Sequence, residues 1–82
     1  MRLPRDLSGL QLASSPHRYG YTLVRQTGSH IRLRSTLKGT EHHITIPSHK
    51  ALSIGTLSRI LTDVAGYLEM PRPRLVEELF PH

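Results

Sequence analysis

The sequence predicts an α+β domain: a three-stranded antiparallel sheet with helices on one face, plus a short helix near the C-terminal end. Three observations lead to this prediction. Runs rich in β-branched or alternating apolar residues occupy 21–26, 29–37 and 41–46, with turn signals between them. An apolar stripe at helical spacing covers 54–68, and a weaker stripe opens the chain. Since a sheet with one apolar face needs a helical layer over it, the order α-β-β-β-α follows.

The first helix is expected to start at Asp6 or Ser8, because either side chain can accept a hydrogen bond from the first turn. Its apolar positions come at a spacing of three: Leu7, Leu10 and Ala13. Pro16 has no N–H for a continuing helix, so the helix should end or kink near 14–15. Gly20 then ends this segment of the chain.

The strand 29–37 alternates most clearly. Its two faces are Ile31, Leu33 and Leu37 on the inward side, and His30, Arg32, Arg34 and Thr36 on the outward side. Period two predicts a half-buried strand with a basic open face. Thr27-Gly28 and Lys38-Gly39-Thr40 are turn signals on either side of it. In the strand 41–46, Ile44 and Ile46 should point inward, and Pro47 should stop the strand.

The main helix should begin after Ser53 as N-cap and end at Gly66, which would leave Leu68 just beyond it. Its apolar stripe is Ile54, Leu57, Leu61, Val64 and Leu68. Pro71 and Pro73 should interrupt the chain before a last short helix over 74–80, whose apolar residues are Leu75, Val76, Leu79 and Phe80.

Composition excludes several classes of protein. A chain of 82 residues is expected to form one domain over 1–82, and the lack of cysteine excludes disulfides and thiolate metal sites. Nothing resembles a signal peptide or a membrane span, so we expect a cytoplasmic protein with no membrane association.

The charge points to a polyanionic partner. The net charge is +5, and nine of the eleven basic residues are arginine, whose guanidinium suits bidentate contact with phosphate. The basic excess lies in residues 1–62, whereas 63–82 is slightly acidic. Nucleic acid is the first hypothesis. The alternative is a basic surface that only keeps the protein in solution.

Two motifs stand in register along the chain. The first is a Gly-aromatic pair, a short strand, Arg-Gln, one residue and Gly-Ser-His; here these are Gly20-Tyr21, Arg25-Gln26 and Gly28-Ser29-His30. The second is a strand ending in Thr-aliphatic-Pro-x-His before a Gly-Thr-Leu helix start; here these are Thr45-Ile46-Pro47-Ser48-His49, Gly55-Thr56-Leu57 and Ile60-Leu61. Together they resemble the HicA toxin family, also described as YcfA-like mRNA interferases, over roughly residues 7–65.

The resemblance implies a fold like that of the double-stranded-RNA-binding domain. It also implies a toxin that cuts mRNA as an endoribonuclease without a metal or other cofactor, and a HicB-type antitoxin as partner, with a homodimer possible inside the complex. The family's catalytic residue corresponds to His30. Two features depart from the family: Pro16, where the first helix normally continues, and 67–82, which extends beyond the usual core of about 7–66.

RNA cleavage explains why a histidine beside arginines is suitable. The 2′-hydroxyl must lose a proton, the leaving oxygen must gain one, and charge on phosphorus must be neutralised; imidazole titrates near pH 6.5 and guanidinium stays positive. We therefore assign RNA contacts to residues around the catalytic His30. The candidate RNA-binding residues are Arg25, Gln26, Ser29, Arg32, Arg34, Lys38 and Lys50.

Simpler interpretations stay open for several of these residues. His30 could be a surface histidine at a strand start, Arg32 and Arg34 a solvated strand face, and His49 either a second proton donor or a plain loop residue. A metal site is not expected, because His42 and His43 should point to opposite faces. Ser29 and His30 are not expected to form a nucleophile–base pair, since the side chains of neighbours on a strand diverge. Rival functions are a non-catalytic RNA-binding module and a basic subunit for an acidic partner.

Overall fold

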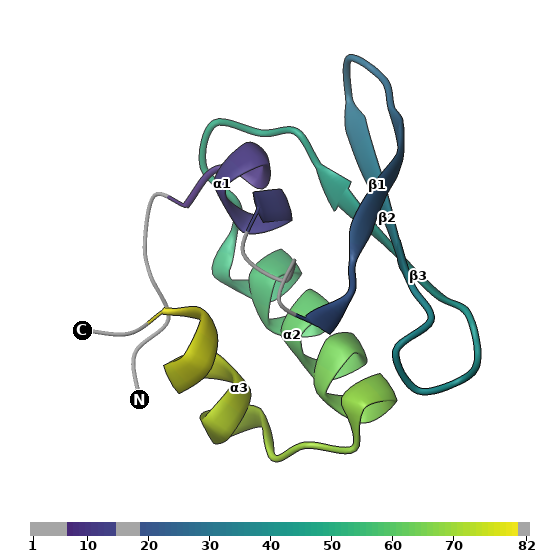
Figure 1. Cartoon of the computed structure of the whole chain (residues 1–82). Helices are drawn as coiled ribbons and strands as arrows, with labels where there is room; N and C mark the ends of the chain where they lie inside the picture. The colour runs from purple at the N-terminus through teal and green to yellow at the C-terminus, as the bar shows by residue number, and fades with distance from the viewer. Residues whose placement is uncertain (1–6, 15–18, 81–82) are drawn as a thin grey trace.

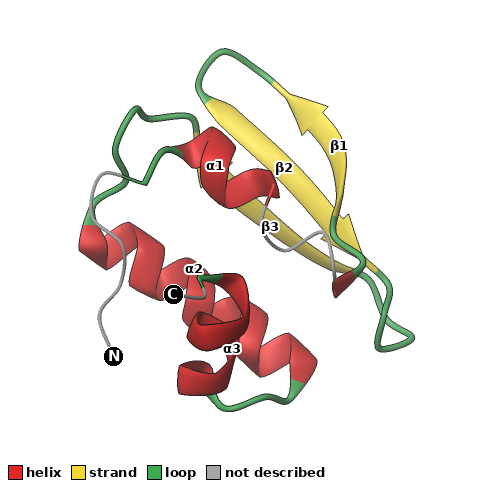
Figure 2. Ribbon diagram, turned by 60° about the vertical axis from the view of Figure 1, so that its left-hand side comes forward, coloured by secondary structure: helices red, strands yellow, loops and turns green. Residues whose placement is uncertain are grey.

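The architecture is a three-stranded sheet with α1 and α2 packed against one face and α3 packed on α2 (Figures 1 and 2). A computed structural model describes residues 7–14 and 19–80. The elements are α1 (Gly9–Ser14), β1 (Thr22–Gln26), β2 (His30–Ser35), β3 (His42–Pro47), α2 (Ile54–Leu68) and α3 (Arg72–Leu79). The sheet order is β1-β2-β3, and both pairs are antiparallel. The predicted α+β fold of the double-stranded-RNA-binding type is thus confirmed.

Strand β2 separates its two faces as the alternation predicts, with Ile31 and Leu33 buried and His30, Arg32 and Arg34 exposed. The prediction for Leu37 is wrong, because the strand ends at Ser35 and Leu37 is 58% exposed. Ser35 is buried in its place; its hydroxyl donates to the Tyr19 carbonyl and accepts from the Leu37 N–H. Both hydrogen bonds of the Ser35 hydroxyl are thus satisfied although the residue is buried, and the chain leaves the sheet directly after it.

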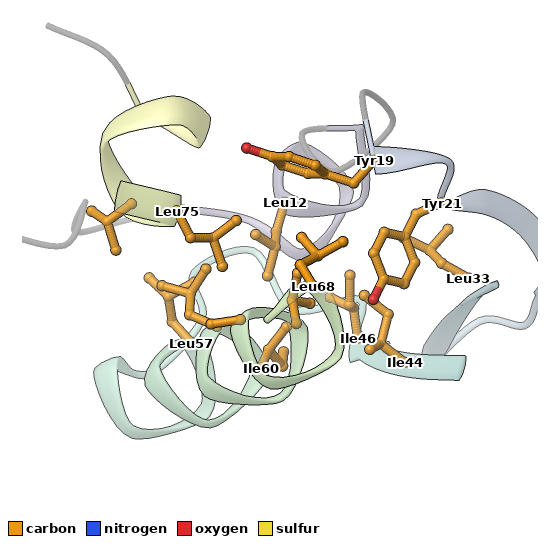
Figure 3. Packing of buried hydrophobic residues seen from close by; sticks show 14 of the residues in the cluster. Leu12, Tyr19, Tyr21, Leu33, Ile44, Ile46, Leu57, Ile60, Leu68 and Leu75 are labelled. Atoms are coloured by element: carbon orange, nitrogen blue, oxygen red, sulfur yellow. The ribbon is translucent and has the colours of Figure 1, made fainter. Parts of the chain in front are cut away.

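The core lies between the helices and the inner face of the sheet. Figure 3 shows Leu12 of α1, three strand side chains, and leucine and isoleucine side chains of α2 and α3 converging on one volume. The labelled strand residues are Leu33, Ile44 and Ile46. Tyr19 and Tyr21 close this core beside β1. Burial of this cluster fixes which face of the sheet stays open.

Helix α1 is capped at Ser8 and ends near the predicted position, but it packs with a different face from the one predicted. The Ser8 hydroxyl accepts from the Gln11 N–H at 3.1 Å, and the Ser8 N–H donates to the Gln11 Oε1 at 2.9 Å, which is a reciprocal cap. The helix ends at Ser14 as expected; Asp6 and Pro16 lie outside the described residues. Leu10 was expected to face the core but is 59% exposed.

Gly9 decides the face that α1 presents to the sheet. A Cβ at Gly9 would lie 2.0 Å from the carbonyl oxygen of Pro47, so only glycine lets the helix start approach the end of β3 this closely. The Gly9 N–H donates to the His49 carbonyl at 3.0 Å. With α1 docked in this way, Leu12 points into the core. The threefold spacing from Leu7 had predicted that Leu10 would do so.

Helix α2 begins at the predicted cap and runs further than predicted. The Ser53 hydroxyl accepts from the Thr56 N–H at 3.1 Å, but Ile54 is 49% exposed. The predicted stop at Gly66 is wrong: the helix continues through Leu68, which is buried, and Glu69 takes the left-handed cap position with a φ of 54°. Burial of Leu68 in the last turn outweighs the low helix propensity of glycine.

Helix α3 starts at Arg72, two residues before the predicted 74. Pro73 does not interrupt it, because a proline in the first helical turn lacks an N–H that would be unpaired there anyway. Leu75 and Val76 are buried against the rest of the core, as predicted. None of the described helices is both long and apolar enough to cross a membrane.

Candidate active site

The turn between β1 and β2 is held by the side chain of Thr27. Its hydroxyl accepts from the His30 N–H at 3.0 Å, while the Thr27 N–H donates to the His30 carbonyl at 2.9 Å. These bonds close the turn around Gly28 and fix the backbone of His30 as the first residue of β2. The imidazole is therefore carried by a defined strand end.

His30 has one ring nitrogen engaged within the chain. The Ser29 Oγ lies 2.9 Å from the His30 Nδ1, although the two side chains were expected to diverge. That expectation is wrong because Ser29 belongs to the turn, and the alternation of a strand begins only at His30. Within the described chain the Nε2 makes no hydrogen bond, so it is the nitrogen open to a substrate.

A bulge in β1 brings Arg25 onto the open face. The pairing of β1 with β2 shifts between Leu23 and Arg25, so Arg25 lies opposite Arg32. Without the extra residue, Arg25 would share the helix-covered side with Leu23, which lies opposite Leu33. The bulge therefore places two guanidinium groups, those of Arg25 and Arg32, side by side on the open face.

The open face continues onto β3. Arg34 lies opposite His43, Arg32 opposite Thr45, and His30 opposite Pro47. The open face thus carries His30 at one end of β2 and Arg25, Arg32, Arg34 and His43 further along the sheet. All five side chains belong to exposed residues. The structure brings the predicted His30 and the three predicted arginines together on one surface, and His43, which was not a predicted site residue, lies with them.

The cations of this surface differ in what neutralises them. Arg34 pairs with Glu41 at 3.3 Å, with both side chains well exposed, which is a weak interaction. Among the described residues, Arg25 and Arg32 form no ion pair. Their charge is therefore the more available for an anionic ligand.

Lys38 is placed apart from His30. It lies in the turn that joins β2 to β3, at the opposite end of β2, and its Nζ pairs with Glu69 at 3.5 Å. Any contact of Lys38 with RNA would be distant from the imidazole.

Lys50 lies in a loop tied to the His30 turn. The Ser48 N–H donates to the Ser29 carbonyl at 3.0 Å, and the Ser48 hydroxyl donates to the Gly28 carbonyl at 3.2 Å. The loop after β3 is therefore fixed beside the residues that precede His30. Lys50 is exposed two residues further on, at the same end of the sheet.

Gln26 belongs to the other face of the sheet. It lies opposite the buried Ile31, and it lines an apolar hollow of about 540 Å³ between α1 and β1. Leu10 and Leu23 line the same hollow. Gln26 is therefore not on the surface that carries His30 and the arginines.

His42 and His43 point to opposite sides, as predicted. The His42 Nδ1 lies 2.6 Å from the Tyr21 hydroxyl, and its ring stacks on Tyr67 with centroids 4.7 Å apart. His43 is on the open face. Across residues 7–14 and 19–80, no three histidine or carboxylate side chains are grouped as a metal site would need.

A polar hollow of about 300 Å³ lies at the free edge of β3, beside His30. The strand residues that line it include His43 and Thr45, and α2 contributes Arg59 and Asp63. Sequence reasoning did not select these two residues of α2. The available signal was a pair of opposite charges four residues apart on the polar side of the main helix.

The fold is of the double-stranded-RNA-binding type, and its site is a histidine that shares the open face of the sheet with arginines. A family model described as the HicA toxin of bacterial toxin-antitoxin matches residues 16–65. This segment covers more than half of the chain and includes both motifs, so the chain belongs to the HicA toxin family. It is a toxin of a toxin–antitoxin system, and membership implies a HicB antitoxin partner. No curated protein and no solved structure matches the chain.

Proposed function

We propose that the protein is an endoribonuclease that cuts mRNA with His30 and needs no metal ion. The observation that carries this proposal is the environment of His30: Ser29 holds the Nδ1, while the Nε2 is open on the face that carries Arg25 and Arg32. Members of the HicA family are generally ribonucleases, which supports the same conclusion.

The chemistry follows from the RNA itself. The Nε2 of neutral His30 takes the proton of a 2′-hydroxyl, and the 2′-oxygen attacks the adjacent phosphorus. The bond from phosphorus to the 5′-oxygen breaks, and that oxygen gains a proton from the imidazolium or from water. The products are a 2′,3′-cyclic phosphate and a 5′-hydroxyl. The guanidinium groups stabilise the extra negative charge on the phosphorane.

Inhibition by the antitoxin fits the same surface. A HicB-type protein with acidic side chains would cover His30 and neutralise Arg25 and Arg32, so substrate phosphate could no longer approach. The site of action is the cytoplasm, where the mRNA is. If two copies of the toxin associate within the complex, each copy would carry its own site, because His30 and the arginines belong to the sheet of a single chain.

The test compares wild-type toxin with His30→Ala and His30→Gln on end-labelled RNA in the presence of EDTA. The toxin is purified as its antitoxin complex and then released. We expect a loss of 100-fold or more in both variants, in line with the usual contribution of a general base. Arg74→Gln on α3, away from the open face, is the control and should retain activity, whereas His49→Ala tests whether that exposed loop histidine is a second proton donor.

Equal cleavage by wild type and His30→Ala, or cleavage of a substrate with a 2′-deoxyribose at the cut, would overturn the proposal. Salt-sensitive RNA binding without turnover would instead select a non-catalytic RNA-binding module. The unpaired Arg25 and Arg32 favour that second function independently of His30.

A further inference from the structure

The hollow at the β3 edge connects the sheet to α2. It is lined on the strand side by His30, His43 and Thr45, and on the helix side by Arg59 and Asp63. β3 is the edge strand farthest from β1 (Figure 2), so no further strand of the described chain covers this side. A ligand at His30 can therefore extend over the edge of the sheet toward α2.

Arg59 gives the hollow a cation that the fold does not use. Arg59 is exposed, and within the described chain it makes neither a hydrogen bond nor an ion pair. It reaches the hollow from a different element than the arginines of the open face. A phosphate that follows the one at His30 could therefore be bound from the α2 side.

Asp63 makes the hollow unlike a plain phosphate site. An ionised carboxylate only accepts hydrogen bonds and repels phosphate, so Asp63 favours a ligand group with N–H or O–H donors. It lies one helical turn after Arg59, and the two form no salt bridge with each other. A ligand that presents a phosphate to one and donors to the other matches this pair.

We propose that this hollow is a subsite for one nucleotide of the RNA, next to the cleaved phosphate, and that it prefers guanine. The inference rests on the proposed function, since it supposes that RNA reaches His30. Guanine offers two neighbouring donors, N1–H and the exocyclic amine, on the edge that an unpaired base exposes, and one carboxylate can accept both. Adenine and cytosine offer only the amine there, and uracil only N3–H. A hollow of about 300 Å³ is large enough for a small ligand group such as a base.

The experiment measures cleavage of four short RNAs that differ only in the nucleotide beside the cut, placed first on its 5′ side and then on its 3′ side. We expect wild type to favour the guanine substrate about 10-fold on one side, and Asp63→Asn to lose most of that preference. Arg59→Gln should lower kcat/KM about 10-fold on all four substrates without changing their order. Thr62→Ala and Arg72→Gln are the controls: Thr62 is an exposed residue of α2 that does not line the hollow, and Arg72 is on α3.

An active enzyme whose base preference and kcat/KM are unchanged in Asp63→Asn and Arg59→Gln would overturn the subsite and leave the proposed function standing. If wild type cuts none of the RNAs, the proposed function fails, and the subsite is tested by titrating guanosine and adenosine 5′-monophosphates into the toxin. Amide chemical shifts around His43 and Asp63 should then respond to the guanine nucleotide at lower concentration. Equal responses, or no response, would overturn the subsite independently.

Discussion

The hydroxyl of Ser29 and the Nδ1 of His30 lie 2.9 Å apart, across the junction between the turn and β2. A hydroxyl can donate or accept, so this contact can persist whether the Nδ1 carries a proton or not. It therefore fixes the orientation of the ring in both the neutral and the charged form. A histidine that exchanges protons with RNA needs this property.

Replacing Ser29 tests that relationship. We expect Ser29→Ala to lower kcat about 10-fold and to displace the pH–rate profile, because the ring loses the hydrogen-bond partner that fixes its orientation and contributes to its proton affinity. Ser29→Thr keeps a hydroxyl and should restore most of the rate. If the alanine variant shows an unshifted profile and only a raised KM, Ser29 binds substrate and does not position His30.

RNA affinity should depend on the unpaired arginines of the open face. On single-stranded RNA with 2′-O-methyl groups, which lacks the nucleophile, we expect Arg32→Gln to reduce the salt dependence, d log K/d log[salt], by about 0.7. Arg74→Gln makes the same charge change on α3, where Arg74 pairs with Glu78, and should leave the slope unchanged. Equal slopes for both variants would mean that Arg32 makes no phosphate contact.

Two glycine substitutions should change stability in opposite directions. Gly9→Ala places a methyl against the Pro47 carbonyl and should lower the free energy of unfolding by about 3 kcal/mol. Gly66→Ala, within α2 and with open space around its Cα, should raise it by about 0.5–1 kcal/mol. Urea denaturation of the two variants checks both signs, and a stable Gly9→Ala would show that α1 can dock differently.

Tyr21 should make the protein sensitive to alkali. Burial, and then the neighbouring Tyr67 and Asp63, raise the pKa of Tyr21 above its usual 10.0. The folded chain then keeps a proton that the unfolded chain loses, so stability should fall as the pH rises above about 10, by at most about 1.4 kcal/mol per pH unit.

Denaturation at pH 8, 10.5 and 11.5 measures this loss. The control is Tyr21→Phe, which removes the ionisable group together with its bond to His42. This variant should start less stable and lose less on going to pH 11.5. Parallel losses in the two proteins would assign the alkaline transition to other groups.

Much of the fold was predictable because local patterns and long-range packing agree. The burial of Ile31 and Leu33 and the helix cap at Ser53 could be predicted from residues close in the sequence, and the structure confirms both. Leu10, Leu37 and Gly66 were assigned wrongly for a common reason. Each depends on a contact from elsewhere in the chain, such as the approach of Pro47 to Gly9, which spacing alone does not show.

The candidate site divides in the same way. His30 and its outward face follow from the motif and from period two, but the bulge that turns Arg25 beside Arg32 depends on strand pairing. The hollow at β3 depends on how α2 crosses the sheet, so Arg59 and Asp63 carried no visible link to His30 in the sequence.

The bonds from Ser48 to Gly28 and Ser29 have a consequence for the timing of toxicity. A nascent chain that has emerged only as far as β2 contains the imidazole but lacks the segment that braces its turn. On the proposed mechanism, cleavage competence should therefore arise only after β3 and the following loop have left the ribosome and folded. An antitoxin synthesised beside the toxin would then bind a target whose site is completed by this loop.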